Sequence, residues 1–506
     1  MSKESYIILK NNSLRVDFTE IPVLEYTLFS DLVKLLLKED FRHCVAYYAF
    51  EEDQKLKFLC CIADDQSHEL FVFSHEAGKN GLSLKSLTPE CPQMQNFERE
   101  IHENFGVQFE GHPWLKPVRY SYHRADQSKV MDNYPFFEIE SEELHEVGVG
   151  PIHAGVIEPG HFRFICNGEN VLHLEIHLGY QHRGIENLFL EKENPLQRCI
   201  LAESIAGDTA VGHALAHVQL MESLAGITIN KRLQIERCIA LELERLAVHI
   251  GDTAALCTDV AYQLGQVVCE ALRTTIINST QLWCGNRFGK GLIRPGGTNY
   301  PLNETVTDHI EKVLEDTGKR FMKLTDLIYS LPSVLSRFDG IGIVTKEQSL
   351  TIGAVGMAAR TTGIPRDVRS SHPFQFFKSY KVEPVLTSSG DVLARGMQRN
   401  LEARQSIHII KELISEWQKL SDELQLPDYH YQLKPNSFAV SMVEGWRGEI
   451  CHSAITDERG RVIHYKVKDP SFHNWMALAL AVRNQEISDF PVCNKSFNLS
   501  YCGFDL

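Results

Sequence analysis

The amino-acid sequence predicts an α+β protein, in which a small mixed N-terminal domain precedes a larger, mainly helical domain with a small β-sheet. Segments rich in aromatic and β-branched residues, typical of strands, lie close together before residue 80. Apolar residues recur with helical period over 196–224, 231–275 and 308–330. Alternating apolar and polar residues between 437 and 468 favour an antiparallel sheet.

The first domain is predicted to cover residues 1–122. LFSDLVKLLLKED has a helical period over 28–40, whereas FRHCVAYYAF, KLKFLCCIAD and HELFVFS are typical of strands. A charged helix start near Phe97 leads into an FG turn and a GHP turn. Residues 123–147 are polar and hold neither period, so we expect a linker there.

The second domain is predicted to cover residues 148–506. Strand-like HFRFICNG and NVLHLEIHLG precede the long helices. SFAVSMVEG, GEICHSAI and RVIHYKV are expected to form the small antiparallel sheet, and WMALALAVRNQ the last helix. We expect the tail from residue 489 onward to be extended and rich in turns.

Composition limits the classes of function. A chain of 506 residues has room for two or more domains with their own cores. The net charge of -15 argues against nucleic acid as a partner. The 13 cysteines form no CxxC pair and residues 1–10 show no leader pattern, which predicts a reducing cytoplasm. No apolar run reaches the roughly 18 residues of a membrane span.

Two sets of motifs carry a resemblance to known families. FEREIHENFGVQFEGHPWLKPVRY (97–120) resembles the signature of the small hydrophilic C-type subunit of respiratory complex I. GPIHAGVIEPGHFRF (150–164) and HLGYQHRGIENL (177–188) resemble the opening of the larger D-type subunit of complex I and of nickel-iron hydrogenase large subunits. Further pieces agree in order: LELERLAVHIGD, IRPGGTN, ARTTGIPRDVR, GDVLARGMQRNLEARQS and EGWRGE. A C-like domain fused to a D-like domain resembles the large subunit of formate hydrogenlyase type complexes and of energy-converting hydrogenase related complexes.

The resemblance also shows what this chain lacks. In the hydrogenases, the stretch matching ESIAGDTAVGH (203–213) carries a CxxC followed four residues later by a histidine, and the chain ends with a second cysteine pair. His213 is kept here, but the four cysteine positions hold Ala206, Thr209, Ser500 and Gly503. Soft thiolates hold a nickel-iron centre, and none of these side chains replaces one. We therefore expect no metal, no cofactor and no hydrogenase activity in this chain.

Cys502 lies one residue from a ligand position. In an extended tail, a shift of one residue turns a side chain to the opposite side, so this thiol is not expected to substitute for a ligand. Cys493 is still more remote.

The catalytic candidates are His153, Glu186 and His213. His153 matches the family histidine that meets a quinone headgroup, although the family tyrosine would fall near Gly207, where no tyrosine stands. The alternative is a turn histidine that satisfies backbone groups beside Pro151.

Glu186, with Arg183 and His182, is a candidate for a proton path or for the lining of the emptied cavity. The alternative is an ion pair that fixes the turn. His213 and His217 share a helical face and could present two imidazoles to a metal, but packing or a hydrogen bond is favoured over zinc.

Several charged residues are candidates for an interface. Asp391, Arg395 and Glu402 lie at helical spacing where the family contacts its iron-sulfur subunit, and Arg183 is a further candidate. A solvated helix face is the alternative. Glu242, Arg245 and His249 also share one face and are expected either to pair with each other or to serve the function. These three lie in LELERLAVHIGD.

The resemblance implies partners and a location. The partners are a small iron-sulfur protein, like the hydrogenase small subunit or the B-type subunit of complex I, together with antiporter-like and other membrane subunits. The cluster is expected in the partner, because no cysteine grouping here suits one. The chain would lie peripherally on the cytoplasmic side of the cell membrane, in an oxidoreductase complex linked to NAD, quinone and ion translocation.

Three functions stay open from the sequence. The first is a subunit that couples electron transfer from the iron-sulfur partner to the membrane arm, without hydrogenase activity of its own. The second is a redox-silent adaptor that joins the peripheral and membrane arms. The third is an active hydrogenase or quinone-reducing subunit with an altered site.

Overall fold

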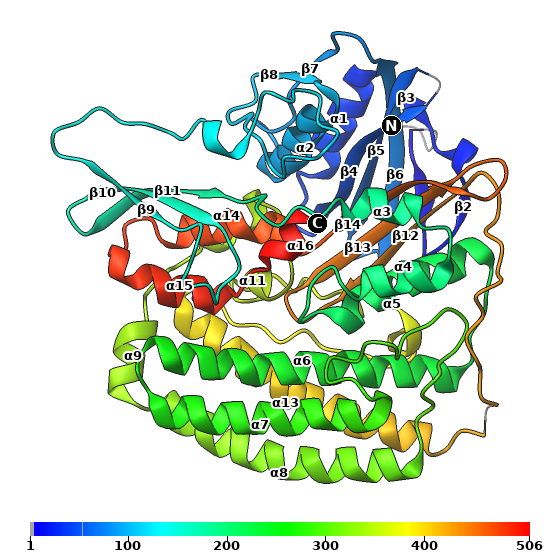
Figure 1. Ribbon diagram of the computed structural model, residues 1–506, viewed down its shortest axis with the longest axis vertical. Coiled ribbons are helices and arrows are strands. Elements are labelled where there is room, and N and C mark those ends of the chain that lie inside the picture. Colours follow the sequence, from blue (N-terminus) through cyan, green and yellow to red (C-terminus); the bar gives the residue numbers. More distant parts are fainter. Residues whose placement is uncertain (1–4, 53, 422) are drawn as a thin grey trace.

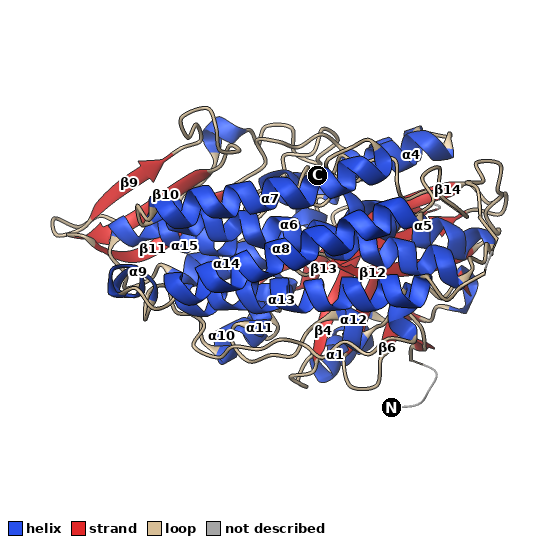
Figure 2. Ribbon diagram, turned by 90° about the horizontal axis from the view of Figure 1, so that it is seen from below, coloured by secondary structure: helices blue, strands red, loops and turns tan. Residues whose placement is uncertain are grey.

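The computed structural model describes residues 5–52, 54–421 and 423–506. An N-terminal sheet packs beside a C-terminal sheet, and a layer of long helices lies along one side of the molecule (Figure 1). The same helices cover the sheets when the molecule is seen from below (Figure 2). The predicted α+β class is confirmed.

The N-terminal sheet has the antiparallel strand order β1 (Ile7–Leu9), β6 (Glu69–Gly78), β5 (Lys55–Asp64) and β4 (Arg42–Glu52). The short strand β3 (Val23–Leu24) runs parallel to β6. The three predicted strands are thus confirmed. The predicted helix is α1 (Tyr26–Leu36), which begins two residues earlier than 28 and ends four residues before 40.

The turn segment after this sheet contains α2 (Gln95–Phe105) between β7 (Ser83–Lys85) and β8 (Gln108–Glu110), which pair in parallel. Helix α2 ends in the predicted FG turn, where Gly106 takes a φ of 72°. A left-handed residue is the usual end of a helix, and glycine adopts it without a steric penalty.

The long helical stretches are more divided than predicted. The stretch 196–224 is two helices, α4 (Pro195–Ala202) and α5 (Ala210–Ala225), and the stretch 231–275 is α6 (Lys231–Asp259) and the start of α7 (Gln263–Cys284). In the first break, the carbonyls of Ser204 and Ile205 accept hydrogen bonds from the side chain of Arg183. Helix period alone does not reveal such breaks.

Two further long helices complete this layer. They are α8 (Glu304–Ile328), predicted as 308–330, and α13 (Val392–Trp417). Side-chain N-caps fix where three of these helices begin, because each accepts a hydrogen bond from an otherwise unpaired backbone N–H. The caps are Asn230 for α6, Asn303 for α8 and Asp391 for α13.

The predicted C-terminal sheet is confirmed, with β12 (Ser437–Glu444), β13 (Glu449–Thr456) and β14 (Val462–Lys468) in antiparallel order. Its fourth strand, β2 (Val16–Asp17), comes from the N-terminal segment and pairs with β12. Every residue of β12 and β13 is buried. Helix α5 covers one face, and β4 of the N-terminal sheet lies next to β14.

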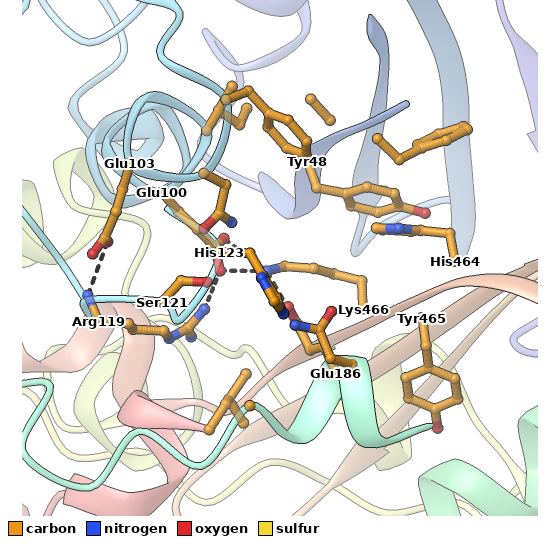
Figure 3. Close-up of a pocket in the computed structure, with 18 of the residues that line it drawn as sticks. Tyr48, Glu100, Glu103, Arg119, Ser121, His123, Glu186, His464, Tyr465 and Lys466 are labelled. Atoms are coloured by element: carbon orange, nitrogen blue, oxygen red, sulfur yellow. Dashed lines mark hydrogen bonds and ion pairs between the residues drawn. The ribbon is translucent and has the colours of Figure 1, made fainter. Parts of the chain in front are cut away.

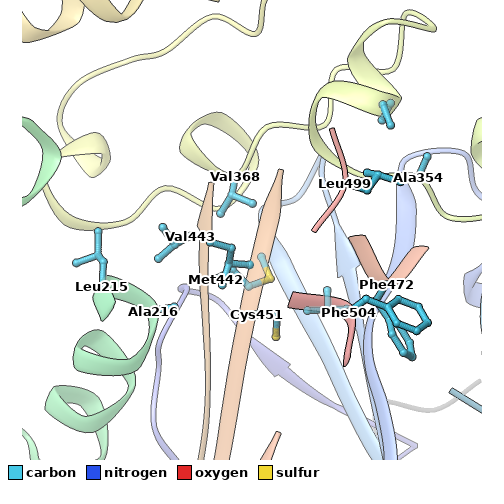
Figure 4. Close-up of a cluster of buried hydrophobic side chains, with 14 of the residues drawn as sticks. Leu215, Ala216, Ala354, Val368, Met442, Val443, Cys451, Phe472, Leu499 and Phe504 are labelled. Atoms are coloured by element: carbon cyan, nitrogen blue, oxygen red, sulfur yellow. The ribbon is translucent and has the colours of Figure 1, made fainter. Parts of the chain in front are cut away.

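One apolar core continues between the two sheets (Figure 4). Met442 and Cys451 on the C-terminal sheet, Leu215 on α5 and Phe472 belong to it. A buried contact crosses this boundary: Glu449 of β13 lies 2.8 Å from His43 of β4. Within the C-terminal sheet, the same carboxylate pairs with Lys468 of β14 at 2.7 Å. A buried charge needs its partners, so the contact with His43 helps to fix how the two sheets meet.

The expectation of an extended tail is wrong. Helix α14 (Ser471–Ala481) is the predicted WMALALAVRNQ helix, but α15 (Phe490–Phe497) and α16 (Tyr501–Asp505) follow it. Pro491 stands in the first turn of α15, and the Ser500 hydroxyl caps α16 by accepting from the Gly503 N–H at 2.9 Å. Helices of eight and five residues are too short to show a period.

The hairpin strands of the second domain are confirmed as β10 (His161–Asn167) and β11 (Asn170–His177), with β9 (His145–Val149) beside β10. The domain limits 1–122, 123–147 and 148–506 stay a prediction.

The remaining elements are short: α3 (Ile185–Glu191), α9 (Pro332–Phe338), α10 (Lys346–Thr351), α11 (Gly356–Arg360), α12 (Val368–Ser371), and the 3-10 helices Phe18–Glu20, Pro92–Met94, Met131–Asn133, Gln375–Lys378 and Ile487–Asp489. Within the described ranges, none of the helices is long and apolar enough to span a bilayer.

The turn between β12 and β13 yields a prediction. Gly448 has a φ of 139°, and a Cβ built there would lie 2.6 Å from the Cα of Gly356. Gly448→Ala should therefore lower the free energy of unfolding by about 2 kcal/mol or more, because backbone on both sides has to move. Urea unfolding followed by circular dichroism measures this. The matched control is Gly78→Ala, which has open space and no positive φ; an equal loss in both variants contradicts the explanation.

Candidate functional site

The four positions that correspond to nickel ligands in the hydrogenases lie where the loop between α4 and α5 meets Ser500 and the start of α16. Arg183 joins these two segments. Its guanidinium donates to the carbonyls of Ser204 at 2.7 Å, Ile205 at 2.8 Å and Cys502 at 3.2 Å. The fold therefore brings together the two segments that carry these positions, although they are almost 300 residues apart in the sequence.

Arg447, in the turn between β12 and β13, is a second clamp. Its guanidinium makes two bonds of 2.7 Å to the Asp208 carboxylate, and its Nε donates to the Asn498 carbonyl at 2.6 Å. A bidentate arginine–carboxylate pair fixes orientation as well as distance. Burial would raise the pKa of Asp208, but the charge and hydrogen bonds of Arg447 bring it below its ordinary value.

The side chains at the four positions do not fit a nickel centre. All four are buried, and the two hydroxyls are engaged: Thr209 donates to Asp208 at 3.0 Å, and Ser500 caps α16. A Cβ built on Gly503 would lie 2.6 Å from Oδ2 of Asp469, so a carboxylate fills the space that a side chain there would need. Neither the space nor the donor atoms suit soft-metal coordination. Among the described residues, no three or more His, Cys, Asp or Glu side chains are grouped to hold a metal ion.

Cys502 is placed differently from our expectation. It lies in the first turn of α16 rather than in an extended strand, with its Sγ 3.5 Å from the Ser500 Oγ. Burial and the nearby Glu158 carboxylate raise the pKa of this thiol to about 12. Burial likewise raises the pKa of Cys493 to about 12. Both cysteines are therefore protonated thiols at neutral pH, which are poor metal ligands.

His213 begins a buried chain of hydrogen bonds. Its Nε2 lies 3.1 Å from Asp469 Oδ2, and its Nδ1 lies 3.1 Å from His452 Nε2. The Tyr465 hydroxyl in turn lies 2.8 Å from His452 Nδ1 and 2.8 Å from His217 Nδ1. We call these five residues the histidine–tyrosine chain. His213 and His217 thus have separate partners and do not converge on one point.

Parts of the chain match two known protein families. Residues 25–126 match the family described as the 30 Kd subunit of respiratory-chain NADH dehydrogenase. Residues 259–437 and 425–505 match its 49 Kd subunit. The chain is a fusion of these two complex I domains. The resemblance predicted from the motifs is confirmed.

Curated relatives of the fusion carry two kinds of name. Formate hydrogenlyase subunit 5 of Escherichia coli is 26% identical over 84% of this chain and 77% of that protein. The carbon monoxide-induced hydrogenase of Rhodospirillum rubrum is 29% identical over 70% of this chain and 97% of that protein. NADH-quinone oxidoreductase subunit 4 of Thermus thermophilus is 26% identical over 69% and 90%.

The three catalytic candidates lie in three separate places of the fusion. His213 is fully buried next to Asp469. His153 is half-buried at the border of a cleft of about 370 Å³, and its Nε2 donates to the Gly160 carbonyl at 2.8 Å. This backbone contact is the one that the turn-histidine alternative describes, and it is compatible with both roles. The catalytic role of His153 stays a prediction.

Glu186, on α3, faces a cavity of about 380 Å³ between the 30-kDa and 49-kDa domains (Figure 3). It accepts from the Val467 N–H and lies 3.0 Å from Lys466 Nζ. Lys466 also bonds Glu100 at 2.6 and 2.7 Å, and Arg119 pairs with the same carboxylate. The motif near residue 120 contains Arg119, but nothing in the sequence indicates that it meets Lys466.

The interface candidates on α13 are buried inside the chain. Asp391 caps α13 and also accepts from the Gly340 N–H. Arg395 donates to the Ser496 hydroxyl and to the carbonyls of Gly390 and Gly342, and burial lowers its pKa to about 10. The alternative of a solvated helix face is wrong, because the three α13 candidates are at most 2% exposed. Contact with a partner stays a prediction.

Glu402 is the centre of a larger buried network. It lies 2.9 Å from Arg360 Nε, 2.9 Å from His249 Nε2 and 3.4 Å from Arg245 Nη1. Arg360 also bonds Glu444 at 2.6 Å. Although burial would raise the pKa of Glu402, Arg360 and His249 hold it well below its ordinary value. Next to this network, the expected pairing of Glu242 with Arg245 is seen at 3.5 Å.

This network yields a second prediction. Glu402→Gln keeps the size of the side chain but removes the charge that balances Arg360 and Arg245. We expect the free energy of unfolding to fall by about 3 kcal/mol or more, since an uncompensated buried charge costs that much. Urea unfolding measures the loss. The matched control is Glu315→Gln, whose ion pair with Lys319 is exposed and screened by water, and which should not change the midpoint.

Proposed function

We propose that this fusion is the large peripheral subunit of a membrane-bound, complex I-like complex, and that it takes part in electron transfer from an iron-sulfur partner without hydrogenase chemistry of its own. The observation that carries the proposal is the former nickel position. There, Asp469 fills the space beside Gly503, and two arginines hold the flanking segments. The same scaffold is present without the side chains that hold nickel.

The names of the relatives support the proposed place of this chain in a complex I-like assembly. Relatives named as hydrogenase and as NADH-quinone oxidoreductase subunits each align with about 70% or more of this chain. We therefore assign the chain an iron-sulfur partner subunit, antiporter-like membrane subunits and a peripheral location on the cytoplasmic side of the cell membrane. An electron acceptor other than protons, such as a quinone, would react near the closed nickel position.

A redox-silent adaptor is the second candidate. The observation that favours it is the same pair of clamps, because Arg183 and Arg447 fill the space between the two segments with fixed hydrogen bonds. An adaptor needs only this rigidity. It needs no path for protons and no acceptor.

The metal content of the complex tests the first part of the proposal. We expect the complex, purified with its native partners, to contain iron but no nickel by plasma mass spectrometry, and to show no hydrogen uptake with methyl viologen. Nickel near one atom per complex would contradict the assignment and restore hydrogen chemistry. A nickel-iron hydrogenase purified by the same procedure is the control that nickel survives it.

Optical spectroscopy of the partner's cluster separates the two candidates. In the electron-transfer function, a cluster reduced with dithionite is reoxidised when decylubiquinone is added to the complex. In the adaptor function, reoxidation is no faster with the large subunit present than with the isolated iron-sulfur subunit. The second outcome would leave the adaptor as the function.

A further inference from the structure

We propose that the histidine–tyrosine chain is a proton relay that ends at the closed nickel position. Its five members come from two parts of the fold. His213 and His217 lie on α5, whereas His452 lies on β13, Tyr465 on β14 and Asp469 directly after β14. The ability to relay protons follows from the histidine–tyrosine chain alone. The use of the relay, which is to supply a proton to an acceptor reduced beside Ser500 and Gly503, rests on the proposed function.

The contacts form one unbroken line. Starting from His217, successive polar atoms lie 2.8, 2.8, 3.1 and 3.1 Å apart, ending at Asp469 Oδ2. Each distance is within hydrogen-bond range. All five side chains are at most 1% exposed, so bulk water does not compete along the line.

The direction of each hydrogen bond follows from the Asp469 end of the line. Burial would raise the pKa of Asp469, but hydrogen bonding from His213 and the charge of Arg447 bring it below its ordinary value, so it is an acceptor. His213 therefore donates from Nε2 and accepts at Nδ1 from His452 Nε2. His452 then accepts at Nδ1 from the Tyr465 hydroxyl, which accepts from His217 Nδ1. Every donor points toward Asp469.

Burial keeps two rings of the line neutral. It lowers the pKa of His217 to about 3 and the pKa of His452 well below its ordinary value. Phe189 stacks on Tyr465 with ring centres 4.0 Å apart and on His217 at 5.1 Å, which holds both rings in place. A neutral, fixed and uniformly directed line is suited to passing a proton without trapping a charge.

The proton enters at the His217 end. His217 Nε2 is buried and, in the described part of the chain, has no hydrogen-bond partner; the same holds for Arg198 Nε and Tyr431 Oη. The charge of Arg198 acts on both His217 and Tyr431, so these groups are electrostatic neighbours. Buried polar atoms of this kind are the usual partners of ordered water. Arg198 lies on α4 close to the exposed residues Gln197 and Ile200, so α4 leads from this end of the line toward the surface.

The transfer step balances. A proton from water binds His217 Nε2, and the Nδ1 proton of His217 passes to the Tyr465 oxygen. The Tyr465 proton passes to His452 Nδ1, the Nε2 proton of His452 to His213 Nδ1, and the Nε2 proton of His213 to Asp469 Oδ2. One proton enters, one carboxylate becomes neutral, and every hydrogen bond is kept with its direction reversed.

The other end places the proton where the proposed function needs it. Asp469 Oδ2 lies at the space beside Gly503, and the Ser500 Oγ lies at the same space. A proton held on Asp469 is therefore next to the position at which the hydrogenase relatives have their second cysteine pair. His452 and Tyr465 use their polar atoms within the line, so Asp469 is the member that delivers the proton.

Tyr465→Phe tests the relay in the full-length protein. It removes one hydroxyl, keeps the stacking on Phe189 and breaks the line between His217 and His452. The measurement is exchange of the His213 and His452 ring N–H protons with deuterium oxide, followed by nuclear magnetic resonance of protein labelled with nitrogen-15 in histidine. We expect exchange at both rings to be at least tenfold slower in the variant. Unchanged exchange would overturn the relay.

A purely structural role for Tyr465 predicts the opposite result. Loss of a stabilising hydrogen bond would open the core more often and make exchange faster, so faster exchange would also overturn the proposal. The matched control is Tyr47→Phe, which removes the hydroxyl of another fully buried tyrosine outside the line. Its exchange rates should equal those of the unmodified protein.

The complex with its native partners tests the purpose of the relay. Reoxidation of the partner's cluster by decylubiquinone should be at least tenfold slower with Tyr465→Phe and unchanged with Tyr47→Phe. If the unmodified complex shows no reoxidation, the proposed function fails, whereas the exchange measurement still decides the relay. If the unmodified complex turns over and Tyr465→Phe matches it, the relay does not serve the acceptor and that part of the proposal is overturned.

Discussion

The structure depends on the neutralisation of a buried set of carboxylates by arginines around Glu402. Glu402 on α13 meets Arg360, the last residue of α11, and Arg360 reaches Glu444 at the end of β12. Buried charges tolerate no missing partner, so the two helices and the sheet have to assemble together. Burial is the larger influence on Glu444 and raises its pKa to about 7, which relieves the excess of acids over arginines near neutral pH. The polar centre is thus what fixes the fold around the site.

The network around Glu402 also positions the segments that carry Ala206, Thr209, Ser500 and Gly503. Glu444 is the last residue of β12, and the turn after it carries Arg447, whose guanidinium holds Asp208 and the Asn498 carbonyl. Fixing β12 through Glu444 therefore fixes the clamp three residues later. Hydrogen bonds from two arginines, Arg183 and Arg447, join the loop and the C-terminal segment.

The sequence predicted the α+β class and the strands of both sheets, because alternation is a local signal. It did not predict Asp469, His452 or Tyr465, which lie about 240 to 256 residues from their α5 partners. His452 and Tyr465 belong to strands whose pattern is ordinary, and Asp469 directly follows β14. The tail helices were missed because five or eight residues show no period. The catalytic candidates His153, Glu186 and His213 were chosen from family motifs, but they lie in different parts of the fold. Membership in a shared set of motifs therefore did not indicate that the side chains meet.

The composition of the histidine–tyrosine chain argues for a use beyond packing. A core position filled by leucine or phenylalanine needs no partners, whereas each imidazole or hydroxyl placed there loses its water and has to find a bond. Four such groups follow one another here without a gap, and Nε2 of His217, which has no hydrogen-bond partner among the described residues, lies at the end opposite Asp469. A set chosen only for stability would have no reason to leave its free acceptor at one end and to direct every donor toward the other. A line that takes up protons at one end and delivers them at the other requires both features.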